Sequence, residues 1–466
     1  MLCRAGVPVF PAISINSNQG CVVRIDGWKD YIKALVMKKI VVVGGGAGGL
    51  ELVTRLSKSL GKSGSADIIL VDKSRTHVWK PLLHEVAAGV IDKGSDGVDY
   101  RMHAVRHHYQ FQLGELTGID REQKLITLDP LVDESGQQIL PQRNLEYDYL
   151  VLAMGSVCND FGTPGVQDNC FTLDSLDQAE RFHRALLNQL LKINQDCVDK
   201  TELQIGIVGA GATGTELAAQ LHHVANLARA YGMPEMSADR LKVTIIEAGE
   251  RILPALPEKI ALSARKALTK LGIKIRESTK VAKATEQGFI TSEGELIAAD
   301  LMVWSAGVKA PDFLVAMDVF ETNRANQILV TPQLRSTVDN DIFVIGDCCG
   351  FKQKDGSWVP PRAQSAHQMA TVAADNIIAL FKDKPLSEYQ YKDYGSLVHL
   401  SKYSTVGSLM GALSNSSMFV EGRLAKLVYV SLYNNHQFTV HGWFKGILTL
   451  FSRKVSNIVG PKFKLH

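Results

Sequence analysis

The stretch at residues 39–72 constrains the fold more than any other part of the chain. An apolar strand runs into a turn containing Gly44, Gly46 and Gly49, a helical pattern follows, and a second apolar strand ends on Asp72. Glycines at this spacing permit a tight turn and let the backbone approach a pyrophosphate, while the acid accepts hydrogen bonds from ribose hydroxyls. The stretch therefore predicts a dinucleotide site; the alternative, a glycine turn without a ligand, needs all four features to coincide.

The same pattern occurs a second time. Gly209, Gly211 and Gly214 follow another apolar strand and open another helix, and the next strand ends on Glu247. An insertion at residues 230–240 explains the longer gap to the acid. A carboxylate at this place binds the 2′-hydroxyl of NAD and repels the 2′-phosphate of NADP. We therefore expect two dinucleotide sites in the chain, the second of them for NADH.

Length and composition limit the number of domains and the kinds of partner and site that the chain can have. A chain of 466 residues is long enough for two or three domains. The formal net charge of +3 does not by itself indicate a nucleic-acid partner. The seven cysteines form no C-x-x-C pair and no zinc-ligand spacing, so neither a disulfide framework nor a metal site is predicted. No secretory signal and no run of 18 apolar residues occurs.

Two later glycine turns fit the same kind of sheet. Gly155 follows an apolar strand at 147–152, where it permits close approach to a ligand at the sheet edge; a plain turn is the alternative. Asp347 ends the segment 341–347, DIFVIGD, where its carboxylate can reach the hydroxyls of an extended dinucleotide; taken alone, a glycine and an aspartate after a strand usually form a plain turn. The predicted fold class is α/β, with two Rossmann-like dinucleotide-binding domains.

Taken together, the two glycine fingerprints, the turns after them and three further segments resemble one known family. The segments are 79–89 (WKPLLHEVAAG), 361–370 (PRAQSAHQMA) and the basic C-terminal end. They are similar to the type II NADH:quinone oxidoreductases of gamma-proteobacterial type, within the two-dinucleotide-binding-domain flavoproteins. The resemblance runs from about residue 38 to residue 466. Only residues 1–36 lie outside it. We expect translation to start at or near Met37; the alternative is that residues 1–36 form a poorly ordered extension.

The resemblance assigns roles residue by residue. It implies one non-covalent FAD, with these positions in its site: Gly44, Gly46, Gly49, Asp72, Lys80, Gly155 and Asp347. For NADH it implies Gly209, Gly211, Gly214, Glu247 and Gly307. It also implies five segments: the extension at 1–36, the FAD domain at 37–165 and 301–385, the NADH domain at 166–300, and a membrane-anchoring region at 386–466.

Three side chains are expected to act in catalysis. Gln364 and Gln368 lie one helical turn apart and match the quinone motif of the family, with the small Ala363 and Ala366 leaving room for a flat ring. From spacing alone they would be solvated glutamines at a helix start. Glu216, in the first turn of the second helix, is either a helix-capping carboxylate or, as the resemblance implies, a group that orients substrates or relays protons.

The final segment, 422–466, contains seven lysines and arginines and neither aspartate nor glutamate. Its apolar residues are spaced so that a helix would have an apolar face beside a basic face. That composition suits a membrane surface with anionic lipids. The alternatives are a dimer interface, a core helix with solvated lysines, and a nucleic-acid arm, which the aliphatic content disfavours.

The expected activity is transfer of two electrons from NADH through FAD to a membrane quinone, without proton pumping. The expected location is peripheral, on the cytoplasmic face of a bacterial inner membrane, and the sequence leaves monomer and homodimer open. One rival is a sulfide:quinone oxidoreductase, with Cys158 and Cys348 in the place of its paired cysteines. A dithiol reductase lacks a close cysteine pair. A non-enzymatic flavin sensor of NADH is the rival from another class.

Overall fold

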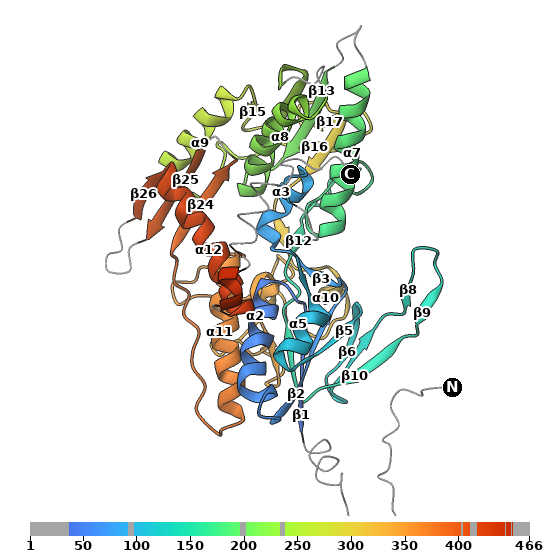
Figure 1. The fold of residues 1–466 in the computed structure, drawn as a ribbon, viewed down its shortest axis with the longest axis vertical. Helices are drawn as coiled ribbons and strands as arrows, with labels where there is room; N and C mark the ends of the chain where they lie inside the picture. The colour runs from blue at the N-terminus through green and yellow to red at the C-terminus, as the bar shows by residue number, and fades with distance from the viewer. Residues whose placement is uncertain are drawn as a thin grey trace, which may run out of the picture.

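The computed structural model describes residues 37–450, apart from 92–96, 196–201, 234–237, 402–403, 411–416, 443 and 449. The expected extension at 1–36 and the basic residues after 450 lie outside the described part of the chain. Figure 1 shows two α/β halves joined end to end, one made mainly from the blue and orange parts of the chain and one from the green and yellow parts. The predicted α/β fold class is confirmed.

The first half is built on a parallel sheet in the order β22-β11-β1-β2-β5. Its strands are β1 (Lys38–Val43), β2 (Ala66–Asp72), β5 (Gln110–Leu113), β11 (Tyr149–Leu152) and β22 (Ile342–Val344). Four-residue apolar runs in β1 and β11 are buried on both faces, which is the pattern of a covered parallel sheet. The strand β22 comes from late in the chain, so the sheet is completed by a segment that follows the whole second half.

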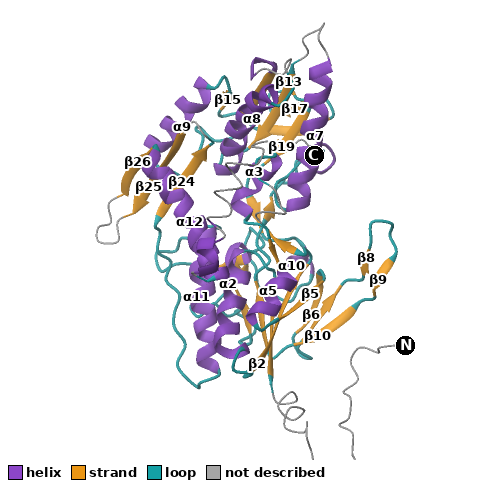
Figure 2. Ribbon diagram, viewed as in Figure 1, coloured by secondary structure: helices purple, strands orange, loops and turns teal. Residues whose placement is uncertain are grey.

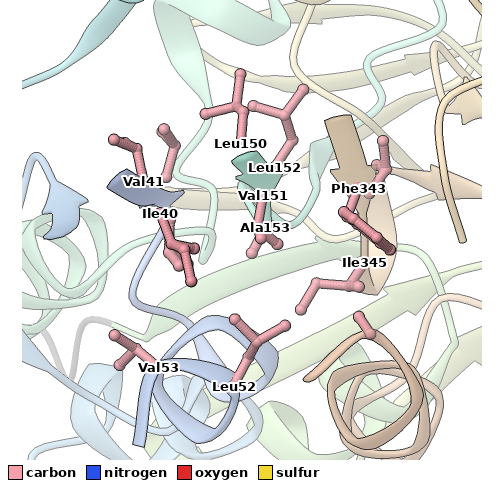
Figure 3. Packing of buried hydrophobic residues seen from close by; sticks show 14 of the residues in the cluster. Ile40, Val41, Leu52, Val53, Leu150, Val151, Leu152, Ala153, Phe343 and Ile345 are labelled. Carbon is pink, nitrogen blue, oxygen red and sulfur yellow. The ribbon is translucent and has the colours of Figure 1, made fainter. Parts of the chain in front are cut away.

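Two helices cover one face of this sheet, α2 (Ala47–Leu56) and α11 (Ala363–Leu380), and they lie side by side. Figure 3 shows Leu52 and Val53 of α2 facing the apolar side chains of β1 and β11. The two helices approach closely because Gly48 has no side chain; a Cβ there would stand 3.4 Å from Cβ of Ala366. Ala366 therefore packs against α2.

The second half repeats the plan with a parallel sheet in the order β15-β14-β13-β19. Its elements are β13 (Leu203–Val208), α8 (Ala212–Ala230), β14 (Leu241–Ile246), α9 (Glu258–Lys270), β15 (Lys274–Arg276) and β19 (Leu301–Trp304), with α7 (Leu176–Gln195) against them. The apolar pattern of residues 297–307 by itself predicts a single strand, and this prediction is wrong. These residues belong to two strands in different sheets, β18 (Leu296–Ala298) and β19, because the chain turns at Asp300, whose carboxylate accepts from the backbone N–H of Gln204 in β13.

Smaller sheets surround these cores. One contains β6 (Leu116–Asp120), β7 (Leu125–Leu128) and β10 (Arg143–Glu146), and another contains β16 (Val281–Thr285), β17 (Gly288–Thr291) and β18. The two halves are joined by β12 (Val157–Cys158) paired with β20 (Val308–Lys309). The hairpin of β8 (Leu131–Val132) and β9 (Gln138–Leu140) extends away from the body of the molecule (Figure 1).

The C-terminal part forms an antiparallel sheet of β24 (Gly395–Leu400), β25 (Ser404–Met410) and β26 (Ser417–Glu421), followed by α12 (Arg423–His441). Figure 2 shows this sheet beside α8 and α9, with α12 leading back to α2 and α11. The helix α12 is partly a core helix, because Ala425, His436 and Val440 are buried. Within the described residues, no helix is long and apolar enough to cross a membrane.

Candidate active site

The first glycine turn holds its conformation through backbone hydrogen bonds and one carboxylate. Gly44 has φ +100°, a region that favours glycine, and its N–H donates to the carbonyl of Val71 at 2.8 Å. The next N–H, of Gly45, donates to Oδ2 of Asp72 at 2.6 Å. The end of β2 is thereby fastened to the turn, and each carboxylate oxygen keeps a further lone pair for another donor.

The other two glycines of this turn face different surroundings. A Cβ on Gly49 would stand 1.9 Å from the carbonyl oxygen of Gly44, so only glycine lets the helix sit this close to the strand. A Cβ on Gly46 would meet nothing within 4 Å. Gly46 also begins α2 without a side-chain cap, which leaves the N–H groups of the first helical turn for an anion. We call the glycine turn at 44–49 and the N-terminus of α2 the first corner. A pyrophosphate fits there, because the space beside Gly46 is open and N–H donors face it.

The second turn repeats the first in detail. Gly209 also has φ +100°, and its N–H donates to the carbonyl of Ile246 at 2.8 Å. The N–H of Ala210 donates to Oε2 of Glu247 at 2.8 Å, and the N–H of Gly249 donates to Oε1 at the same distance. Each acid predicted to hold a ribose thus lies against its own glycine turn.

The remaining glycines of the second turn complete the equivalence. A Cβ on Gly214 would stand 2.0 Å from the carbonyl oxygen of Gly209, whereas a Cβ on Gly211 would meet nothing within 4 Å. Gly211 begins α8 without a side-chain cap. Both halves therefore present a corner that suits the diphosphate of a dinucleotide, and the residues present fit both FAD and NADH.

Three predicted FAD-site positions come together at the edge of the first sheet. Lys80 donates from Nζ to the carbonyl of Ser156 at 2.7 Å, and Oγ of Ser156 donates to Oδ2 of Asp347 at 2.8 Å. Gly155 has φ +71°, so the turn that places Ser156 favours glycine. Sequence reasoning missed Ser156, although it directly follows the glycine that the pattern indicated.

Gly307 lies in the turn before β20, at the junction of the two halves. Its φ of +64° favours glycine, and a Cβ there would stand 2.5 Å from the ring of Phe161. The carbonyl of Gly307 accepts from the N–H of Asn159, 3.4 Å away. The turn thus packs tightly against the loop after β12, and a larger residue would displace Phe161.

Glu216 is buried where the second half meets the C-terminal sheet. Its Oε1 accepts from the backbone N–H of His399 in β24 at 2.8 Å, and its Oε2 is 3.6 Å from Nδ1 of His84 in α3 (Leu83–Ala87). Burial raises the pKa of Glu216 to about 8, and burial lowers the pKa of His84 to about 3. A carboxyl group that keeps its proton at neutral pH can donate that proton, which a simple capping role does not require.

Gln364 and Gln368 lie one turn apart in α11, as expected, but their amides already have partners in the chain. Nε2 of Gln364 donates to Oη of Tyr391 at 2.8 Å and to Oδ1 of Asp393 at 3.0 Å. Gln368 exchanges two hydrogen bonds with the backbone of Lys392, at 2.8 and 3.0 Å. The two glutamines fasten the segment before β24 to α11, and neither is simply solvated.

A carboxylate that sequence reasoning missed lies under the same helix. Glu51 of α2 is 1% exposed and accepts from Nδ1 of His367 at 2.5 Å and from Nδ1 of His436 at 2.7 Å. The sequence did contain one signal for this carboxylate. Glu51 lies between Leu50 and Leu52, which are buried in α2, and a charged residue is rarely buried without a partner.

The cysteines in the described part of the chain show no redox pairing. The four that the structure describes are free: Cys158, Cys170, Cys348 and Cys349. The thiol of Cys158 donates to the carbonyl of Trp304 at 3.3 Å, and that of Cys348 to the carbonyl of Ile345 at 3.4 Å. Burial raises the pKa of each of these two thiols to about 12, so neither is activated as a thiolate.

Comparisons with known proteins agree with this arrangement. Residues 38–370 match the family model described as pyridine nucleotide-disulphide oxidoreductase. A type II NADH:quinone oxidoreductase of Haemophilus influenzae is 44% identical over 92% of this chain and 100% of its own length. A protein of the same name from Staphylococcus aureus is 28% identical, over 80% of this chain and 90% of its own.

Solved structures share the fold. NDH2 of Plasmodium falciparum, in complex with NADH, has a TM-score of 0.76 at 18% identity and covers 92% of this chain and 99% of its own. The sulfide:quinone oxidoreductase of Aquifex aeolicus has a TM-score of 0.67 at 17% identity and covers 91% and 96%. The expected enzyme class, the FAD cofactor and the NADH substrate are confirmed at the level of the family. With 44% identity to a relative whose whole length it covers, the chain belongs to the type II NADH:quinone oxidoreductases.

Proposed function

We propose that this chain transfers two electrons from NADH to a membrane quinone, with FAD as its cofactor and without pumping protons. The observation that carries the proposal is the duplicated turn: Asp72 and Glu247 each accept from their own glycine turn, beside a corner with free helix N–H groups. A bound FAD supplies two-electron chemistry between a hydride donor and a quinone. The protein supplies position and charge.

We assign FAD to the first corner, with Gly44, Gly46, Gly49 and Asp72 at the pyrophosphate and ribose. Lys80, Gly155 and Asp347 complete that site through the chain of hydrogen bonds at Ser156. We assign NADH to the second corner, with Gly209, Gly211, Gly214 and Glu247, and with Gly307 in the turn between the halves. In support, each set of three glycines has two positions that exclude a side chain and one that faces open space.

Glu216 is proposed as a proton-holding group of the reaction. Its pKa of about 8 means that the carboxyl is largely protonated at pH 7 and releases the proton when its surroundings become more polar or more positively charged. Because Glu216 lies between α3, α8 and β24, this proton is held where the second half meets the C-terminal sheet.

Gln364 and Gln368 are proposed to border the quinone site. Their amide groups bond Tyr391, Lys392 and Asp393, so a quinone carbonyl would take over one of these hydrogen bonds. The exchange leaves no buried amide unpaired, because the displaced segment is partly exposed and water replaces the lost partner.

The C-terminal region is proposed to bind an anionic lipid surface, which places the enzyme peripherally on the cytoplasmic face of the membrane. Among the described side chains of residues 422–450, Leu427, Val430, Phe444, Ile447 and Leu448 are exposed apolar residues, and Lys426 and Lys445 are exposed cations. Apolar side chains entering the acyl boundary and cations near anionic headgroups, at about 1 kcal/mol each, favour such binding. Burial of this surface in a homodimer is the competing use.

Anaerobic stopped-flow absorbance tests the activity. NADH is expected to bleach the flavin absorbance, and a short-chain ubiquinone is expected to restore it. Bleaching by sulfide and not by NADH would establish the sulfide enzyme, and bleaching without recovery would establish the sensor.

Vesicle sedimentation tests the lipid surface. Leu427→Glu and Phe444→Glu are expected to abolish binding to vesicles containing phosphatidylglycerol, whereas Leu296→Glu, at another exposed leucine in the second half, keeps it. If the Leu427 and Phe444 variants bind vesicles normally and a dimer dissociates instead, the surface is a homodimer interface.

A further inference from the structure

A buried cluster joins four segments that are far apart in the chain. The carboxylate of Glu51 in α2 accepts from His367 in α11 and from His436 in α12, at 2.5 and 2.7 Å. Nε2 of His436 lies 3.1 Å from Nε2 of His77 in β3 (Thr76–His77). Glu51, His77 and His436 are at most 3% exposed, so this is a set of titratable groups inside the protein.

The charge of the cluster follows from its surroundings. Burial by itself raises the pKa of Glu51, but the hydrogen bonds from His367 and His436 outweigh it and lower the pKa to about 2. Burial lowers the pKa of His77 to about 3, so His77 is neutral. A buried carboxylate without partners is strongly unfavourable, so the ionised form of Glu51 depends on the hydrogen bonds from His367 and His436.

One member of the cluster reaches the surface beside the proposed quinone site. The side chain of His367 is 32% exposed, whereas its partner Glu51 is 1% exposed. His367 lies between Gln364 and Gln368 in α11, three residues after the first and one before the second. Nδ1 of His367 is held by Glu51, which leaves Nε2 as the ring atom for another partner.

We propose that His367 is the proton donor in quinone reduction and that Glu51, fixed by His436, is the residue that positions its ring and keeps it charged. The proposal rests on the proposed function, since it takes the quinone to bind against this part of α11. Oxidation of NADH by a quinone, NADH + H⁺ + Q → NAD⁺ + QH₂, takes one proton from solution.

That proton is assigned to Nε2 of His367. The N–H bond at Nε2 breaks as an O–H bond of the quinol forms, and the neutral ring keeps its Nδ1 proton on Glu51. Solvent then restores the Nε2 proton at the exposed edge of the ring. Carboxylates that hold an imidazole in one orientation and stabilise its charged form act in this way in acid–base catalysis.

Other titratable groups face the cluster. His103 of α5 (Tyr100–His107) and His436 both act on His77, and His441 of α12 is affected by His436. Burial lowers the pKa of His103 to about 3 and also lowers that of His441. His103 is thus neutral at neutral pH, and burial favours the neutral form of His441, so Glu51 is the charged group to change in an experiment.

The competing explanation is purely structural, because Glu51 also fastens α11 and α12 to α2. Glu51→Gln keeps the shape but removes the charge, and His367→Gln changes only the partly exposed end of the cluster. Glu146→Gln is the matched control, since it removes an exposed carboxylate from the ion pair with Lys39 in the same half. FAD content and thermal unfolding report whether each variant folds.

The first measurement does not depend on activity. In the holoenzyme labelled with ¹³C at histidine Cε1, His367 is assigned by its loss from the spectrum of His367→Gln. At pH 7, Glu51→Gln is expected to move the Cε1 resonance of His367 from its wild-type position, because the ring loses its carboxylate partner, and Glu146→Gln to leave the resonance unchanged. An unaltered His367 resonance in a folded Glu51→Gln protein overturns the proposal.

The second measurement separates the two phases of the reaction by stopped flow. Above pH 7, reoxidation by quinone is expected to be about tenfold slower in Glu51→Gln, with the loss shrinking at lower pH. In His367→Ala, added imidazole is expected to restore the rate. A loss that is equal at every pH and is not rescued assigns the cluster a structural role only. Failure of NADH to bleach the wild-type flavin instead refutes the proposed function itself.

Discussion

The carboxylate of Glu216 and the backbone of His399 are joined by a hydrogen bond of 2.8 Å across 183 residues of sequence. Glu216 belongs to the helix that opens the second dinucleotide corner, and His399 belongs to the first strand of the C-terminal sheet. The ring of His399 stacks on Tyr429 of α12, with centroids 5.2 Å apart. A change in the protonation of Glu216 therefore acts directly on a hydrogen bond to the C-terminal part of the protein.

Glu216→Gln is expected to change how stability depends on pH. Because burial raises the pKa of Glu216 to about 8 in the folded state, above its usual range, the wild-type protein loses stability as pH rises from about 4.5 to 8. The variant lacks this loss, so its free energy of unfolding should exceed that of the wild type increasingly over this range, by up to about 4 kcal/mol. Denaturant unfolding at several pH values measures it.

The exposed Glu286→Gln serves as the control and should show the wild-type pH dependence. A constant difference between Glu216→Gln and wild type across pH 5 to 8 would mean that Glu216 is ionised throughout.

Gly49→Ala and Gly214→Ala form a matched pair. Each added Cβ would collide with a backbone carbonyl oxygen, at 1.9 and 2.0 Å, in equivalent corners. The first is expected to weaken FAD binding about 10- to 100-fold and the second to weaken NADH binding to a similar degree while FAD is retained. Flavin absorbance of the purified proteins and an NADH titration distinguish the two effects.

Gly118→Ala is the control for both, because its Cβ would make only an ordinary contact with Thr127, at 3.5 Å. Loss of FAD from Gly214→Ala with normal FAD in Gly49→Ala would reverse the assignment of the two corners.

Glu247→Gln is expected to shift cofactor preference. Removing the negative charge at the end of β14 relieves repulsion of a 2′-phosphate, so the ratio of kcat/KM for NADPH to that for NADH should rise about tenfold. Steady-state kinetics with both nucleotides measures the ratio. Glu250→Gln, an exposed carboxylate in the same loop, should keep the wild-type ratio, and an unchanged ratio in Glu247→Gln would show that the carboxylate does not face the ribose.

Ser156→Ala tests the hydrogen-bonded link between Lys80 and Asp347. The variant loses the hydrogen bond to Asp347, so FAD affinity should fall about fivefold, which corresponds to about 1 kcal/mol. Fluorescence of released flavin during dilution measures this affinity. Ser135→Ala removes a comparable hydroxyl contact with Asp133 in the exposed hairpin and should leave FAD binding unchanged.

The parts of the fold that depend on local signals were predictable from sequence. Both glycine turns, with their strands and acids, lie where the spacing placed them, because backbone and neighbours within a few tens of residues determine them. The division of residues 297–307 between two sheets was not predictable, because only the contact between Asp300 and Gln204 shows that the chain changes sheets there.

The side chains of the candidate site depended on partners that sequence cannot place. Gln364 and Gln368 bond a segment 24 to 30 residues away, and Glu51 pairs with histidines 316 and 385 residues away. The amphipathic pattern of α12 was equally ambiguous, because an apolar stripe suits a core and a lipid surface alike. In α12 both occur: His436 and Val440 are buried, and Leu427 and Val430 are exposed.

The late strand β22 has a consequence for how the chain is made. On the ribosome, β11 emerges long before its neighbour, since Leu150 pairs with Ile342. Every strand of the second sheet has been synthesised by the time that neighbour appears. The second half can therefore reach its native topology first, while one edge of the first sheet stays open. Completion of the proposed FAD site by β22 and Asp347 is thus a late event of biosynthesis, and truncation before residue 342 prevents it while sparing the second sheet.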